Sequence, residues 1–285
     1  MKESIEIFGS QNNLCGTLCV PDDIPLKAGK PCIIILNSGL VYQAGSNRLH
    51  VDMARNIAEL DFCSFRFDLS GIGDSSRSQK NLTYDEQILA DIDDALAFIE
   101  EKTGISSFVL MGICTGADNT HKFALTNSKI TGTIFLDGYA YKTPGYYIRY
   151  YLPRILNPII VANKLGRVIS AFLKPTGTAA ESGQAEEKVE EVSFWVIPPK
   201  EKTVKELKQL VDRNVLQLHI YTFDWIWCFN HQSQFNSMYK EIDFKGSATC
   251  AYFEQSDHVY TMIDDRLKLI KTVSHWLESN FQPSS

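Results

Sequence analysis

One short run of residues has the types and spacing that nucleophilic catalysis requires. Gly112-Ile113-Cys114-Thr115-Gly116 follows the apolar stretch "SFVLM" and precedes a stretch with helical periodicity. A strand, a tight G-x-C-x-G turn and a helix form a nucleophile elbow, here with cysteine in place of the usual serine. The helix N-terminus would stabilise a thiolate. We therefore predict that Cys114 is a nucleophile, and a buried thiol in a tight turn is the less favoured interpretation.

A histidine in the right place could act as the base for such a nucleophile. His258 lies in "FEQSDHVYT", just after the last predicted strand and before the final helix. A lone loop histidine is usually surface decoration, but this position is where the fold places a catalytic imidazole. Among the other five histidines, His231 is the reserve candidate, because it opens a predicted helix close to the expected site.

An acid must fix the imidazole tautomer and stabilise imidazolium. Asp224 follows the penultimate strand in "LHIYTFDWIW", and the resulting chain order of Cys, Asp and His is one that catalytic triads use. Asp137, which ends the strand before it, is the alternative acid. Asp257 ranks third, because adjacent side chains in a loop rarely converge. Asp224 is the preferred acid.

Backbone amides are expected to hold the negative oxygen of an acyl-transfer intermediate. The sequence "LNSGLVYQAGS" follows the first buried strand, and we predict the N–H of Leu40 and the N–H of Thr115 as the two donors. Asn37 and Ser38 offer side-chain donors nearby. A second glycine-containing loop, "FRFDLSGIGDSS", has no third glycine at a phosphate-binding spacing, so a structural role beneath the site is expected.

Composition narrows the function further. The 285 residues are 44% hydrophobic and carry a formal net charge of -6, which argues against a nucleic-acid partner. The seven cysteines are scattered without CxxC spacing, so we expect reduced thiols and neither a metal site nor a cofactor. Without an apolar leader or a membrane-length apolar run, a cytoplasmic location is expected.

The order of the predicted elements indicates an α/β fold. An antiparallel pair of strands opens the chain, and strands then alternate with helices, which predicts a mostly parallel sheet with helices on both faces. The helices are expected near 47–60, 84–102 (capped by Thr83), 116–126, 203–213, 230–241 and 262–280, and the later strands near 107–112, 130–136, 215–222 and 248–254.

This alternation breaks between residues 139 and 202. We predict a core of residues 1–138 and 203–285, with 139–202 as an inserted helical cap interrupted at Pro153 and Pro158. Residues 174–192 are small, polar and acidic, a composition typical of a flexible segment. Long insertions in compact α/β domains are often lids over active sites.

Aromatic and basic side chains of the cap suggest a substrate surface. Tyr147, Tyr151 and Arg154, together with Trp225, are candidate substrate-binding residues, with arginine suited to a carboxylate or a carrier phosphate. The alternative is that these rings form the small core of the cap itself.

Several of these motifs resemble those of a known family. "FRFDLSGIGDS" resembles the R-x-D-x-x-G-x-G-x-S loop of serine-aminopeptidase-like α/β-hydrolases. The elbow "GICTGA", the loop "NSGLVYQAGSNRLH" and the cap segment "YYLPRILNP" are more narrowly similar to the exosortase-system-associated hydrolases. This resemblance implies an α/β-hydrolase fold with Cys114, His258 and Asp224 as its triad. Thr115 stands where that family has aspartate, which changes the polarity beside the expected oxyanion site.

The sequence therefore predicts a cysteine-dependent acyl-transfer enzyme. Its substrate would be a small-molecule ester or thioester, possibly bound to a carrier, and the intermediate an acyl-Cys114 thioester. Water as acceptor gives a hydrolase or thioesterase, and another acceptor gives an acyltransferase. A lyase that eliminates a carboxylate and a non-catalytic binding protein are the alternatives. The oligomeric state is not predicted.

Overall fold

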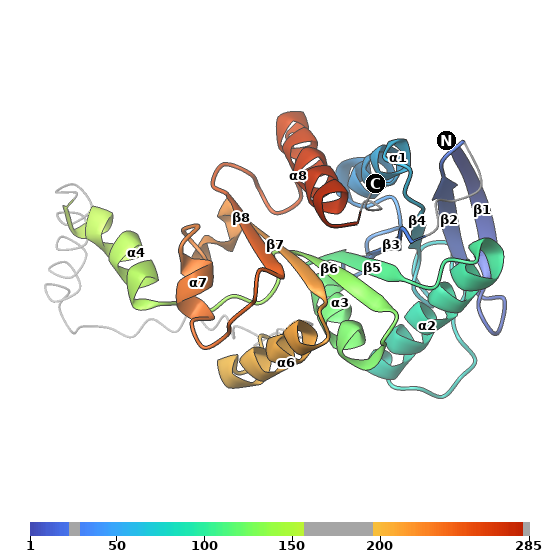
Figure 1. Cartoon of the computed structure of the whole chain (residues 1–285), viewed down its shortest axis with the longest axis horizontal. Helices are drawn as coiled ribbons and strands as arrows, with labels where there is room; N and C mark the ends of the chain where they lie inside the picture. The colour runs from blue at the N-terminus through green and yellow to red at the C-terminus, as the bar shows by residue number, and fades with distance from the viewer. Residues whose placement is uncertain (23–28, 157–195, 282–285) are drawn as a thin grey trace, which may run out of the picture.

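The computed structural model describes residues 1–22, 29–156 and 196–281, and its centre is one eight-stranded sheet (Figure 1). The strand order is β1-β2-β4-β3-β5-β6-β7-β8. β1 and β2 pair antiparallel, as predicted, and β2 also pairs antiparallel with β4, whereas all later pairs are parallel. The strands are β1 (Lys2–Phe8), β2 (Leu14–Val20), β3 (Cys32–Leu36), β4 (Ser64–Phe67), β5 (Phe108–Ile113), β6 (Ile130–Leu136), β7 (Leu216–Thr222) and β8 (Ala248–Phe253).

The central strands are apolar on both faces because helices cover both faces of the sheet. Every residue of β3 and of β5 is buried. In β3, Ile33 and Ile35 belong to one hydrophobic core, while Ile34 and Leu36 belong to the other. This two-sided burial explains why "CIIIL" is a continuous apolar run and not an alternating one.

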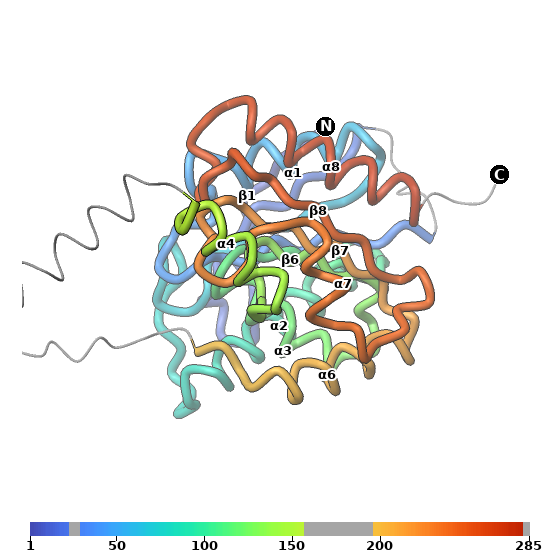
Figure 2. Tube along the Cα trace, turned by 90° about the vertical axis from the view of Figure 1, so that its left-hand side faces the viewer, coloured from blue at the N-terminus to red at the C-terminus, as the bar shows by residue number. Residues whose placement is uncertain are grey.

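The helices form two layers around this sheet (Figures 1 and 2). One core lies between the sheet and the first and last α-helices, and the other lies between the sheet and the remaining helices of the core. The first layer contains α1 (Leu49–Glu59) and α8 (Ile263–Phe281), and the second contains α2 (Tyr84–Thr103), α3 (Thr115–Thr126), α6 (Lys200–Asp212) and α7 (Gln234–Met238). The predicted α/β architecture is confirmed.

Local sequence signals set some helix ends and fail at others. Thr83 caps α2 through a capping box with Glu86, as its position predicted. The helix predicted over 230–241 is wrong in extent, because only Gln234–Met238 is helical. The Gln234 side chain accepts from the Asn230 N–H (3.1 Å) and donates to the Cys228 carbonyl (2.6 Å), so the preceding loop satisfies its backbone without a helical turn.

The described part of the predicted cap is α4 (Pro144–Leu156), which Figure 1 shows extending beyond α7. Its buried anchor is Tyr146, whose hydroxyl lies 3.0 Å from the carbonyl oxygens of both Ile226 and Trp227. The interruption predicted at Pro153 does not occur, because the helix continues to Leu156. Pro153 lies near the C-terminal end of α4, where proline removes only one backbone hydrogen bond of the helix. The segment 174–192 and Pro158 lie outside the described residues.

None of the helices in the described ranges combines the length and apolar character needed to cross a membrane.

Close packing at the end of β5 gives a test of the fold. A Cβ on Gly112 would lie 2.2 Å from the backbone C and O atoms of Gly116, so we expect Gly112→Ala to destabilise the protein by about 3 kcal/mol or more. Gly104, at the end of α2, has φ of +75°, but no atom lies within 4 Å of the position that a Cβ would take there. Gly104→Ala should therefore cost only about 1 kcal/mol, from backbone strain. Urea denaturation of both variants measures the difference, and equal losses would contradict the packing argument.

Candidate active site

Cys114 lies at the turn between β5 and α3 with a backbone conformation unusual for a residue other than glycine. Its φ is 55° and its ψ is -119°. Its N–H donates to the Leu136 carbonyl at 3.0 Å, and it forms the N-cap of α3. A Cβ on Gly116 would lie 2.7 Å from the Asn37 carbonyl oxygen, which explains why glycine is required after the turn. The geometry is that of a nucleophile elbow.

The imidazole of His258 bonds to a fully buried carboxylate. Its Nδ1 lies 2.7 Å from Oδ2 of Asp137, a residue just after β6. Asp137 also accepts the N–H and the hydroxyl of Thr222, each at 2.7 Å. Three short hydrogen bonds therefore satisfy this buried carboxylate and fix the ring that faces it.

His258 also interacts with Cys114, and the two partners together determine its charge. Burial by itself would lower the pKa of His258. Hydrogen bonds with Asp137 and with Cys114, and the negative charges of these groups, outweigh burial and raise the pKa to about 10. Trp225 stacks on the ring, with centroids 5.1 Å apart and planes 15° apart, and its indole N–H is held by the Gly138 carbonyl at 3.1 Å. A protonated ring is further favoured by this aromatic face.

The acid preferred from the sequence does not contact the ring. Oδ2 of Asp224 accepts the backbone N–H of His258 at 2.8 Å, whereas the alternative acid Asp137 meets Nδ1. Both carboxylates follow neighbouring parallel strands, β6 and β7, so chain order could not separate their roles. Asp257 bonds to amides of its own loop, and His231 bonds to Ser233.

The loop after β3 lies against the elbow, as expected for an oxyanion site. The Gly39 N–H donates to Oγ1 of Thr115 at 2.6 Å, and the Val41 N–H closes a turn onto the Ser38 carbonyl at 2.9 Å. Within the described residues the Leu40 N–H has no hydrogen-bond partner. The Thr115 N–H belongs to the first turn of α3, where amides lack partners inside the helix. The role of these two N–H groups as oxyanion donors stays a prediction.

Asp68 fixes this loop from below, a role that the sequence did not assign to this residue. The carboxylate of Asp68 is fully buried and accepts hydrogen bonds from the Asn37 side chain, the Gln43 backbone and side chain, and the Asp74 N–H, at 2.7–3.2 Å. The Asn37 amide therefore faces Asp68 and Val41, not the open site. The structural role predicted for the loop "FRFDLSGIGDSS" is confirmed. The sequence signal for this role is Gly73, where glycine is needed because a Cβ would lie 2.4 Å from the Asp68 carboxylate.

A cavity of about 440 Å³, which we call the elbow pocket, opens beside the two predicted donors. Lys122 lines this pocket, and its ammonium group forms ion pairs with the carboxylates of Asp118 (2.9 Å) and Asp85 (3.3 Å). Its lining residues are Gly39, Leu40, Tyr84, Asp85, Thr115, Asp118, Asn119 and Lys122. The sequence analysis did not identify the pocket residues on α2 (Tyr84 and Asp85) or those further along α3 (Asp118, Asn119 and Lys122). Only the fold brings these two helices together.

The four residues predicted to bind substrate lie outside the elbow pocket. Tyr147 and Tyr151 stack on each other on the exposed side of α4, with centroids 6.3 Å apart. The Arg154 guanidinium lies 3.7 Å from the Tyr150 ring centroid and lines a second cavity. Trp225 contacts His258 directly. None of these four residues lines the elbow pocket.

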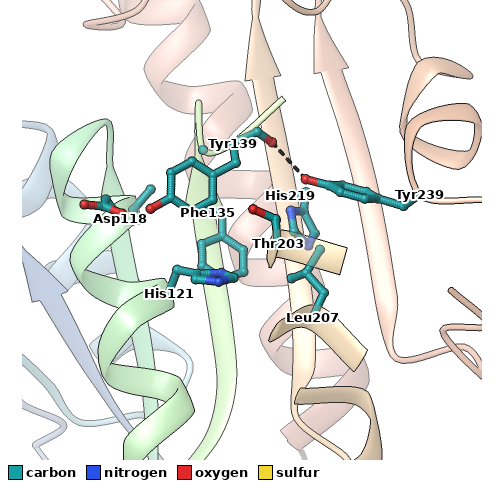
Figure 3. A pocket seen from close by; sticks show the side chains of 10 residues that line it. Asp118, His121, Phe135, Tyr139, Thr203, Leu207, His219 and Tyr239 are labelled. Carbon is teal, nitrogen blue, oxygen red and sulfur yellow. Dashed lines mark hydrogen bonds between the residues drawn. The ribbon is translucent and has the colours of Figure 1, made fainter. Parts of the chain in front are cut away.

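A third cavity is lined by Tyr139 and by side chains of α3 and α6, which Figure 3 shows. His121 pairs with Glu206 at 2.9 Å, and burial lowers the pKa of His219 to about 3, so that ring is neutral. The Tyr239 hydroxyl donates to the Tyr139 carbonyl at 3.1 Å. With room for about one water molecule, this cavity is too small for a substrate.

Comparison with known proteins agrees with the fold described above. Residues 33–159 match the family model described as alpha/beta hydrolase fold. A Xanthomonas campestris protein, described as an a/b serine hydrolase without lid, is similar over 100% of this chain and 97% of its own, with 14% identity and a TM-score of 0.56. The chain has an α/β-hydrolase fold.

Two esterases share this α/β-hydrolase fold. One, from Thermogutta terrifontis, matches 99% of this chain and 100% of its own at 15% identity and a TM-score of 0.54. The other, from Pyrococcus furiosus, matches 99% of this chain and 92% of its own at 12% identity and a TM-score of 0.59. No curated protein matches the chain by sequence. Within the described ranges, no three His, Cys, Asp or Glu side chains are grouped as a metal site.

The hydrogen bond between Asp137 and His258 predicts that the charge of the His258 ring changes at an unusually high pH. The folded pKa of about 10 lies above the usual 6.5, so the ring stays protonated at pH 7–8 and loses its proton near pH 10. Its contribution to folding stability is complete below pH 6.5 and is lost as the pH rises to 10. Asp137→Asn should lower the pKa of His258 more than Asp224→Asn does. NMR titration of the imidazole checks this, and an equal effect of the two variants would contradict it.

Proposed function

We propose that this protein is a cysteine-dependent acyl-transfer enzyme with Cys114 as nucleophile, His258 as acid and base, and Asp137 as the residue that orients the imidazole. The observation that carries this proposal is the position of His258, whose ring interacts with both Cys114 and the buried Asp137. The order nucleophile, imidazole and carboxylate is the one that nucleophilic catalysis needs. Asp224, through the His258 backbone N–H, positions the loop.

The raised pKa of His258 favours an imidazolium next to a thiolate before substrate binds. The Cys114 sulfur then bonds to the carbonyl carbon of an ester or thioester, and the carbonyl electron pair moves to oxygen. The N–H groups of Leu40 and Thr115 would hold that oxygen. When the intermediate collapses, the bond to the leaving group breaks, and His258 gives its proton to the departing oxygen or sulfur. The products are an acyl-Cys114 thioester and the released alcohol or thiol.

His258 is neutral after this step and can act as a base. It takes a proton from the acceptor as the acceptor attacks the thioester carbonyl, and the carbon–sulfur bond breaks to restore the thiolate and imidazolium pair. Water as acceptor releases an acid, and an alcohol, amine or thiol as acceptor receives the acyl group. The two esterases of similar fold favour an ester or thioester donor. The elbow pocket, at about 440 Å³, has the size of a small-molecule site and would hold the acyl group.

Intact-mass spectrometry tests the acyl-enzyme directly. Short exposure to p-nitrophenyl acetate and to an acyl thioester should add one acyl group to wild type and none to Cys114→Ala. His258→Ala should lower the rate of acylation by roughly 10²–10⁴-fold, the usual contribution of a positioned proton donor or acceptor.

Cys250→Ala is the matched control, because Cys250 is the other cysteine that is not fully buried in the described structure. Burial raises the pKa of its thiol to about 12, so this variant should be acylated like wild type. If no donor labels wild type while iodoacetamide still alkylates Cys114, covalent catalysis is ruled out for these donors and a binding protein on the same fold is favoured.

A further inference from the structure

A second cavity lies between α4 and the loops next to His258. Its volume is about 230 Å³. Phe223 and Ile226 come from either side of Asp224 and Trp225. Tyr252 lies at the end of β8, and Glu254 follows that strand just before the His258 loop. The complete lining is Arg149, Tyr150, Arg154, Phe223, Ile226, Asn230, Tyr252 and Glu254. We call it the arginine pocket.

Two arginines face this pocket without a carboxylate partner in the described part of the chain. No ion pair is formed by Arg149 or by Arg154 there, although Glu254 also lines the cavity. Arg154 donates to the Tyr150 carbonyl and stacks on the Tyr150 ring, which leaves further donors of its guanidinium unused. Arg149 makes one long contact, 3.5 Å to the Ser233 hydroxyl.

We propose that Arg149 and Arg154 form a phosphate-binding subsite for the acyl donor, a step that rests on the acyl-transfer function. Two guanidinium groups from different turns of α4 present donors from two directions, which suits the three oxygens of a tetrahedral phosphate monoester. A planar carboxylate is bound well by a single arginine. The buried Oδ1 of Asn230 has no partner and can accept a hydrogen bond from a hydroxyl next to the phosphate.

The place of this pocket assigns the phosphate to the leaving group. The elbow pocket adjoins the predicted oxyanion donors Leu40 and Thr115, so the acyl group lies on that side of Cys114. The leaving group must lie on the side of His258, which protonates it. The arginine pocket is built from segments that flank the His258 loop and Trp225, so it belongs to the leaving-group side. The donor is therefore an acyl ester or thioester whose alcohol or thiol part carries a phosphate monoester.

Matched donors test this subsite. Acetyl-pantetheine 4′-phosphate and acetyl-pantetheine differ only in the phosphate, and wild type should show a KM about tenfold lower or more for the phosphorylated donor. Arg149→Gln and Arg154→Gln should each raise the KM of the phosphorylated donor about tenfold and so remove most of this difference. Lys208→Gln on α6 removes the same charge at an exposed position and should leave the difference intact. The same loss in Lys208→Gln would overturn the subsite, and so would equal KM values for both donors in wild type together with no arginine-dependent binding of the lipid phosphate described below.

Direct binding separates this proposal from the acyl-transfer function. Calorimetry with pantetheine 4′-phosphate should show binding to wild type and to Cys114→Ala, and a loss of affinity of tenfold or more in each arginine variant. Such binding without any acyl-enzyme would support the subsite and reject acyl transfer. An acyl-enzyme without phosphate-dependent binding would support acyl transfer and reject the subsite. A parallel titration with 1-oleoylglycerol 3-phosphate identifies the source: arginine-dependent binding of this lipid alone assigns the phosphate to a lipid, and no binding of either compound overturns the proposal.

Discussion

The close contact between the elbow and the loop after β3 determines the rest of the site. Gly116 packs so tightly on the Asn37 carbonyl that no side chain fits between them. The same contact sets the distance from the nucleophile turn to the loop with the predicted oxyanion donors. Asp68 then fixes Asn37 and Gln43 from the other side. A strained φ of 55° at Cys114 persists because these contacts on both sides determine it.

Buried charge is the second constraint. Asp137 is fully buried, and its carboxylate is tolerated there because Thr222 and His258 supply it with hydrogen bonds. Once the imidazole is held in this way, its other nitrogen is directed to the thiol. Cys114 and Asp137 thus lie on either side of one ring, and the hydrogen bond of each with the ring raises the pKa of His258.

Much of this arrangement was readable in the sequence, for physical reasons. The apolar run of β3 and the spacing of Gly112, Cys114 and Gly116 could be recognised, because two-sided burial and a tight turn each require particular residue types at neighbouring positions. The choice between Asp137 and Asp224 leaves no such local signal. Both carboxylates follow neighbouring strands, and the path of the His258 loop decides which one reaches the ring. For the same reason the elbow pocket was missed, since it joins helix starts that lie far apart in sequence.

Thr115 shows how one substitution beside the nucleophile changes the electrostatics of the site. Its hydroxyl oxygen accepts the Gly39 N–H at 2.6 Å and so ties the loop to α3. An aspartate at this position, as the exosortase-associated pattern has, would place a negative charge next to the proposed oxyanion donors and would oppose charge development on the carbonyl oxygen. Threonine makes the same loop contact without that charge. In the proposed mechanism, the Leu40 and Thr115 amides would therefore hold the oxyanion without that added negative charge beside them.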